Sequence, residues 1–258
     1  FIMMAITIGF VSGFLVADGS MLRAYDDSFQ KYNIEDGYFQ TKKKLTPAQK
    51  EDIEKSDVKV YENFYIEQKL TNGSTIRFFK NRKEVDKVCL MKGKMPKKSG
   101  EIAVDRMYAD NNELKVGDTV KSRKKTFRIT GLVALSDYSA LFQNNNDTMF
   151  DAVKFGVAIV TDKDFEALNQ VKVQYNYAWI YDKKPATEKK EKKMAEDLME
   201  DMADVVTIES FVPQYQNQSI HFTGDDMGSD RAMIVMLLYI VMAILAFVFG
   251  ITISNTIR

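Results

Sequence analysis

The chain begins and ends with long apolar stretches, and polar residues dominate the region between them. No charged residue occurs at positions 1–17 or at positions 233–257. A helix of about 20 apolar residues can cross the hydrocarbon core of a bilayer, and positions 233–253 supply 21 uncharged residues in succession. We therefore expect a transmembrane helix at residues 229–257. We also expect residues 1–17 to form the outer part of another transmembrane helix, whose start precedes Phe1.

Small side chains recur every four residues along both apolar ends. Residues four apart lie on one face of a helix, and small side chains on that face let another helix approach closely. Two interpretations stay open: these faces pack against each other or against further spans, or they reflect the usual frequency of small residues in membrane helices. The first set is Ala5, Gly9, Gly13 and Ala17, and the second set is Ala246, Gly250 and Ser254.

Between the apolar ends, the pattern predicts a helical stalk followed by strands and short helices. Apolar residues keep helical spacing over residues 18–34, so the first span should continue beyond the membrane. The sequence TPAQ at residues 46–49 combines an N-cap, a proline at the first helical position and a glutamine three residues after the cap, and it predicts a helix. Asn72-Gly73 predicts a β-hairpin that joins strands at residues 59–70 and 75–79.

The rest of the middle region alternates strand and helix patterns. Residues 155–160, 173–181 and 205–208 have strand patterns, and residues 187–203 have an amphipathic helical pattern. This order predicts an α+β fold with ferredoxin-like layering. Residues 86–152 are richer in strand signals and loops, and they suggest a separate β-rich piece.

Four aromatic residues alternate along one predicted strand: Tyr175, Tyr177, Trp179 and Tyr181. Side chains two residues apart share one face of a strand. That face is either a surface that binds a partner or an aromatic face packed under a helix.

Composition excludes several classes of function. The 36 Lys and Arg residues balance 36 Asp and Glu residues, so no basic excess favours nucleic-acid binding. The chain contains one cysteine, Cys89, and one histidine, His221. It therefore cannot form an internal disulfide, a Cys/His zinc cluster or a histidine-based catalytic triad. The P-loop pattern GxxxxGK[ST] is absent from the sequence. We expect no catalytic residue, no cofactor and no metal site in this chain.

Charge also predicts the orientation in the membrane. Arg258 follows the second apolar stretch, whereas Asp18 follows the first. Because Lys and Arg favour the cytoplasmic side, residues 18–232 are expected to lie outside the cytoplasm.

Four local strings resemble the permease subunits of the MacB/FtsX-like ABC transporter superfamily, which carry a MacB-like extracytoplasmic core domain. They are residues 99–105 (SGEIAVD), 114–120 (LKVGDTV), 127–133 (FRITGLV) and 255–257 (NTI). The order of these strings, together with the 215 residues at 18–232 between the two expected spans, extends the resemblance over nearly all of the chain. Spans three and four, the coupling segment and the ATPase of the family have no counterpart in this sequence.

The resemblance implies a division of the chain into five parts. They are the outer part of transmembrane helix 1 at 1–17, a helical stalk at 18–34, a porter-like α/β subdomain at 35–84 and 153–228, an inserted β-rich subdomain at 85–152, and transmembrane helix 2 at 229–257.

The resemblance also implies a non-catalytic permease subunit in a bacterial plasma membrane. Its extracytoplasmic domain would transmit ATP-driven motion and engage a substrate or partner, in export. ATP and Mg are expected on a cytoplasmic ABC ATPase, and a second permease is expected to complete a homo- or heterodimer. Two alternatives remain: the extracytoplasmic sensor domain of a two-span receptor or sensor kinase, and an FtsX-like activator of cell-wall hydrolases.

Overall fold

The computed structural model describes residues 2–122, 125–168 and 172–257. The chain forms two compact units. One consists of the two ends of the chain, Phe1–Asp27 and Phe222–Arg258, and the other is Ser28–His221. Two long helices, α1 (Ile2–Tyr32) and α6 (Gln218–Ile257), each cross a boundary between these ranges without interruption.

Helix α6 contains the predicted second span. Among the described residues, Gln218–Val248 is the one helical stretch long and apolar enough to cross a membrane, and none of its most apolar window is buried. Exposed apolar side chains such as Phe247, which is 70% exposed, are unfavourable in water and suit a lipid environment. The predicted first span lies in α1, where most side chains of residues 1–17 are outside the described part, so that span stays a prediction.

The small-residue faces do not pack against each other within the described part of the terminal unit. A Cβ added to Gly9, Gly13 or Gly250 would meet no described atom within 4 Å. Helices α1 and α6 approach closely at Gly224 instead, because a Cβ on Gly224 would lie 2.5 Å from the Tyr25 ring. Packing against further spans stays a prediction. Ala17, Ala246 and Ser254 are exposed, and the side chain of Ala5 lies outside the described part.

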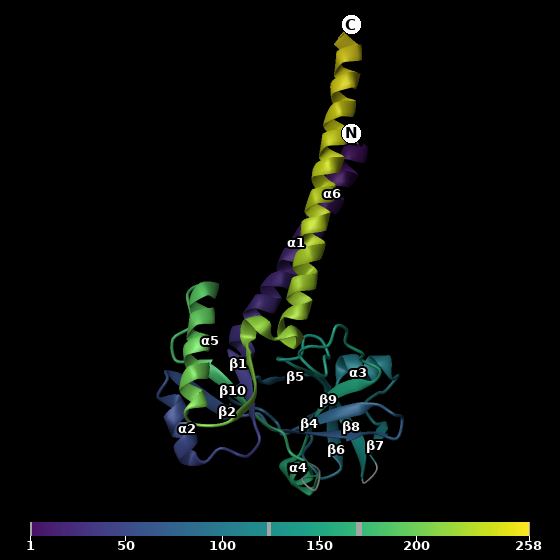
Figure 1. Ribbon diagram of the computed structural model, residues 1–258. Helices are drawn as coiled ribbons and strands as arrows, with labels where there is room; N and C mark the ends of the chain where they lie inside the picture. The colour runs from purple at the N-terminus through teal and green to yellow at the C-terminus, as the bar shows by residue number, and fades with distance from the viewer. Residues whose placement is uncertain (1, 123–124, 169–171, 258) are drawn as a thin grey trace. The chain divides into compact units, whose positions relative to one another are not determined.

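Within Ser28–His221, the first sheet has the predicted ferredoxin-like topology. Its strands are ordered β11-β1-β10-β2, and every neighbouring pair is antiparallel. This is the strand order of two interleaved βαβ units, and Figure 1 shows α2 and α5 lying over the same sheet. The elements are β1 (Gly37–Thr41), α2 (Pro47–Glu54), β2 (Val58–Glu62), β10 (Tyr175–Tyr181), α5 (Glu188–Ala203) and β11 (Ile208–Pro213).

Both helices of this layer begin where the sequence predicts. Thr46 and Gln49 form the reciprocal capping box of α2, and the Thr187 side chain caps α5. The last strand begins later than expected, at Ile208 instead of residue 205. The N–H groups of Val205 and Val206 both donate to the Met202 carbonyl, at 3.0 and 2.9 Å, and so continue the final turn of α5.

The aromatic face of β10 belongs to the core, and its interpretation as a partner surface is wrong. Tyr177, Trp179 and Tyr181 are at most 4% exposed, while Tyr175 is half-buried. They form one apolar cluster with Ile53 of α2 and with Leu198 and Met202 of α5. The two helices keep these aromatic rings out of water, and the burial of their apolar surface stabilises the fold.

The second sheet contains seven strands within the described residues. Its order is β3-β4-β9-β6-β8-β5, and β7 pairs with β8. The predicted Asn72-Gly73 hairpin joins β3 and β4, with Gly73 at φ +89°. The elements are β3 (Tyr65–Lys69), β4 (Thr75–Phe79), β5 (Val88–Gly93), β6 (Glu101–Asp105), α3 (Arg106–Asn111), β7 (Thr119–Lys121), β8 (Thr126–Leu135), β9 (Phe155–Val160) and α4 (Asp162–Leu168).

Sheet membership divides the chain differently from the predicted boundaries. The hairpin β3–β4 and strand β9, expected in the porter-like part at 35–84 and 153–228, lie in the second sheet. The reason is pairing: β9 runs parallel to β4 and antiparallel to β6, so it joins the hairpin to the rest of the sheet. The predicted strand at residues 59–70 is likewise two strands, because the chain passes from the first sheet to the second between Glu62 and Tyr65.

Candidate functional site

Helix α1 ends on the segment that precedes β5. The helix stops at Asn33, which adopts the left-handed conformation with φ 51°, a common way to end a helix. The Asn33 side chain donates to the Glu84 carbonyl at 2.7 Å. The N–H groups of Asp86 and Lys87 donate to the carbonyls of Asn33 and Tyr32, at 3.0 and 2.9 Å. The terminal carbonyls of α1 are thus hydrogen-bonded to the segment that follows β4.

Helix α6 begins on the loop that follows β8. The Asn145 side chain donates to the Gln216 carbonyl at 2.8 Å and accepts from the Gln218 N–H at 2.9 Å. The Ser139 N–H donates to the Ser219 carbonyl at 2.6 Å. This second-sheet loop therefore fixes the first turn of α6 from two sides.

The two junctions also contact each other. The Gln214 side chain donates to the Glu35 carbonyl, and the Asn217 side-chain amide donates to Glu35 Oε1 at 3.3 Å. The Phe29 ring of α1 stacks on the His221 ring of α6, with centroids 6.1 Å apart. The end of α1 and the start of α6 therefore form one connected site inside the Ser28–His221 unit.

A buried charge cluster underlies this connected site. Arg82 pairs with Asp137 through two hydrogen bonds of 2.7 and 2.6 Å. Asp86 lies 3.9 Å from Arg82, and its carboxylate accepts from the Glu35 N–H at 2.8 Å and from the Asn63 side chain at 3.1 Å. All five residues are at most 9% exposed. Three carboxyl groups thus lie near one guanidinium in a region that excludes most water, and of the three only Asp137 is hydrogen-bonded to it among the described contacts.

The excess of carboxyl groups favours protonation. Burial raises the pKa of Glu35 well above its ordinary value, and the nearby charges of Asp86 and Asp137 raise it further. Burial, followed by the charge of Asp137, raises the pKa of Asp86 to about 7 against the opposing effect of Arg82. When ionised, Glu35 Oε2 has no hydrogen-bond donor among the described residues. Protonation of Glu35 removes the buried negative charge, which is unfavourable without a donor to Oε2.

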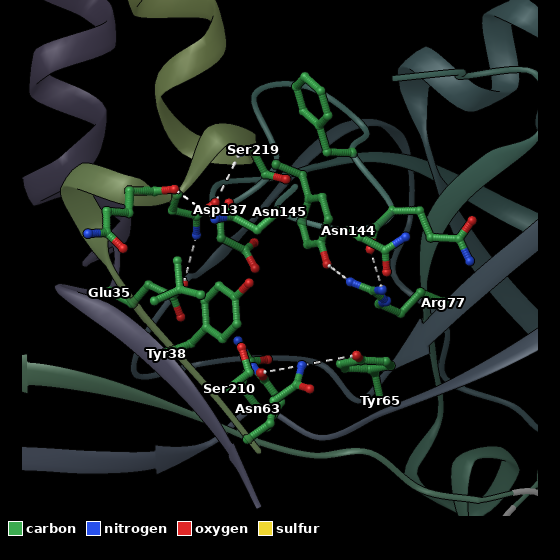
Figure 2. Close-up of a pocket in the computed structure, with 18 of the residues that line it drawn as sticks. Glu35, Tyr38, Asn63, Tyr65, Arg77, Asp137, Asn144, Asn145, Ser210 and Ser219 are labelled. Carbon is green, nitrogen blue, oxygen red and sulfur yellow. Dashed lines mark hydrogen bonds between the residues drawn. The ribbon is translucent and has the colours of Figure 1, made fainter. Parts of the chain in front are cut away.

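A polar cavity of about 370 Å³ borders this cluster, between the two sheets. Figure 2 shows Glu35 and Tyr38 on one side of it and Arg77 and Asn144 on the other. The Arg77 guanidinium donates to Glu67 at 3.0 and 2.6 Å and to the Tyr138 hydroxyl at 2.6 Å. It also lies 4.1 Å from the centroid of the Tyr65 ring. Arg77 is therefore held rigidly in the cavity wall.

The sequence patterns did not identify these residues. The small-residue sets lie in the terminal helices, and the β10 aromatics lie mainly in the core. Glu35, Arg82, Asp86 and Asp137 are ordinary charged residues in a chain with 28% charged residues. No local spacing distinguishes them, since Glu35 and Asp86 are 51 positions apart.

No protein-family model matches this sequence, and no curated protein matches it either. Several solved structures match this chain, and two of them are as follows. The periplasmic region of MacB from Actinobacillus actinomycetemcomitans is 14% identical, with a TM-score of 0.34, over 67% of this chain and 87% of that one. The extracellular domain of the noncanonic ABC-type transporter YknZ from Gram-positive bacteria is 11% identical, with a TM-score of 0.32, over 67% of this chain and 98% of that one.

Proposed function

We propose that this chain is part of a non-catalytic ABC transporter permease, in which the Ser28–His221 unit lies outside the cytoplasm and moves with the membrane helices. One observation carries the proposal: α1 and α6 both run without a break into this unit, and both end at one buried, hydrogen-bonded site. An α-helix transmits tilt and translation along its length, and a well-packed junction passes that motion on.

The strings that resemble the permease family support the proposal in a second way. Three of them meet in the second sheet, since residues 101–105 form β6, 119–120 lie in β7 and 127–133 lie in β8. Strand β8 pairs with both of the others, parallel to β6 and antiparallel to β7. The three strings that match the family in order are therefore also neighbouring strands of one sheet.

The proposed assembly requires partners. A cytoplasmic ABC ATPase would hydrolyse ATP with Mg, and a second permease would complete a dimer in a bacterial plasma membrane. The extracytoplasmic unit would then transmit the motion to a substrate or partner, in export. The P-loop pattern is absent from this sequence, which agrees with ATP hydrolysis on another domain or chain.

Co-purification of the full-length protein from its native membrane tests the assembly. We expect an ABC ATPase to be retained with it. Retention of a kinase or of a cell-wall hydrolase without an ATPase would instead support a sensor or an activator of hydrolases.

Flexible insertions test the transmission of motion. A Gly/Ser insertion after Asp27 and another after His221 would interrupt α1 and α6 at the unit boundaries. The same insertion after Thr148, in an exposed loop, is the matched control. Fluorescent labels on the extracytoplasmic unit should report a conformational change when the complex hydrolyses ATP. We expect the paired helix insertions to abolish this change and the loop insertion to preserve it; an unchanged signal in the helix variant contradicts the proposal.

A further inference from the structure

We propose that the cavity between the two sheets binds an uncharged, hydroxyl-rich ligand of about the size of a disaccharide. Its volume of about 370 Å³ lies within the range of about 300–1,000 Å³ that is typical of small-molecule sites. This inference adds a ligand to the proposed function but does not rest on it, because binding can be measured without transport.

The wall of the cavity carries neutral groups that both donate and accept hydrogen bonds. Side-chain amides supply a carbonyl acceptor and an NH₂ donor, and tyrosines supply a hydroxyl that does both. The Gln40 amide donates to the Tyr65 hydroxyl at 3.1 Å and to the Asn176 carbonyl at 3.2 Å, which orients three lining residues. The Tyr38 ring points into the cavity in Figure 2. Adjacent hydroxyl groups of a sugar match such alternating donors and acceptors.

The charges in the described wall are already compensated. Arg77 is paired with Glu67, and Asp137 is paired with Arg82. Glu35 is the remaining carboxyl group in the wall, and its burial favours the neutral form. A charged ligand would lose hydration on entry without gaining an unpaired opposite charge. Uncharged ligands avoid that cost, so the wall selects against ions.

The position of the cavity gives the ligand access to both helix junctions. Glu35, Asn217 and Ser219 line the cavity and also make the hydrogen bonds that hold the end of α1 and the start of α6. A ligand that forms a hydrogen bond with one of these three residues either competes with the hydrogen bonds at the junctions or stabilises them. Occupancy of the cavity is therefore linked to the geometry of the junctions.

Calorimetric titration of the full-length protein in lipid nanodiscs tests the inference. The uncharged probes are maltose, cellobiose and N,N′-diacetylchitobiose, and the cationic counterpart of the last is the glucosamine dimer. Nanodiscs avoid sugar-based detergents, which would compete. We expect at least one uncharged disaccharide to bind saturably, and we expect the glucosamine dimer to bind about 10-fold more weakly than the acetylated dimer or not at all.

Two variants make the test specific to the cavity. Tyr38→Phe removes one hydroxyl from the wall and should weaken binding about 3- to 10-fold. Tyr61→Phe is the matched control, because Tyr61 and Tyr38 pair with the same residue, Ala178, from opposite sides, and Tyr61 does not line this cavity. The proposal is overturned by equal losses in the two variants, by preferential binding of the cationic dimer, or by no saturable binding of any uncharged disaccharide up to about 20 mM. Binding of acetyl-trialanine amide in preference to all three sugars would also overturn it, in favour of a peptide.

Discussion

Arg82 and Asp137 form a bidentate ion pair in the interior of the Ser28–His221 unit, with hydrogen bonds of 2.7 and 2.6 Å. The pair is surrounded by two further carboxyl groups, those of Asp86 and Glu35. The guanidinium therefore partly compensates a local excess of negative charge. This relationship makes the cluster sensitive both to mutation and to pH.

Removal of the guanidinium should destabilise the Ser28–His221 unit strongly. Arg82→Met leaves Asp137 buried without its partner, which typically costs about 3–5 kcal/mol. The double variant Arg82→Met/Asp137→Leu should recover part of that loss, because Asp137 is no longer left without its partner, while Asp86 and Glu35 still lack the guanidinium. Urea unfolding followed by the fluorescence of Trp179, the single tryptophan, measures both values.

Arg106→Met is the matched control for this experiment, since Arg106 forms an exposed pair with Asp110. Its effect should stay below about 1 kcal/mol. If Arg82→Met lowered the free energy of unfolding by no more than Arg106→Met does, the buried charge cluster would not stabilise the unit as expected.

The stability of the unit should decrease as pH rises through the slightly acidic range. Asp86 has a folded-state pKa of about 7, above the ordinary value of 3.8, so the folded state holds the proton more tightly. Its contribution is fully present below about pH 4 and is lost as pH rises towards about 7. The slope reaches at most about 1.4 kcal/mol per pH unit for one proton. Glu35, Asp137, Arg82 and Asn63 face this carboxyl group and set its titration.

Asp86→Asn tests this dependence, because it keeps an acceptor for the Glu35 N–H and removes the titration. Unfolding free energies of the variant and the parent protein should converge near pH 4 and diverge towards pH 8, with the variant more stable. Asp110→Asn, on an exposed side chain, should follow the parent curve. Parallel curves for Asp86→Asn and the parent would show that Asp86 does not titrate in this window.

Asn145 should control the order of the first turn of α6. Asn145→Ala removes a donor to Gln216 and an acceptor for Gln218, and each lost hydrogen bond is worth about 0.5–1.5 kcal/mol. Amide hydrogen exchange at residues 216–219 should become about 10-fold faster, while exchange in β10 stays unchanged. Asn146→Ala provides the neighbouring control, and equal acceleration in both variants would contradict the specific role of Asn145.

Gly37 should be required for packing at the start of β1. A Cβ at this position would lie 2.3 Å from the Trp179 ring and 2.7 Å from the Val212 carbonyl. Gly37→Ala should therefore displace the tryptophan and cost about 1–3 kcal/mol, as overpacking of a core does. Trp179 fluorescence and urea unfolding report the change. Gly228→Ala, where an added Cβ meets no described atom within 4 Å, should leave both measurements unchanged.

Local features of this chain could be predicted because they depend on residues close together in the sequence. The capping box requires Thr46 and Gln49, three positions apart, and the β-hairpin requires the turn at Asn72-Gly73. Alternation along β10 predicted one aromatic face, and the split βαβ order predicted ferredoxin-like layering. The candidate site could not be predicted in this way, since its contacts join residues up to 182 positions apart.

The sequence by itself determined the apolar ends, the α+β class and most starts of helices and strands. Hydrophobic period, capping and turn chemistry act within a few residues, so they can be identified without knowledge of the fold. Only the tertiary structure decided that β9 joins the second sheet, that the β10 aromatics are covered by helices, and that Glu35, Asp86 and Asp137 share Arg82. Strand pairing and the burial of a charge depend on contacts across the whole unit, and no local pattern specifies which distant residues will supply them.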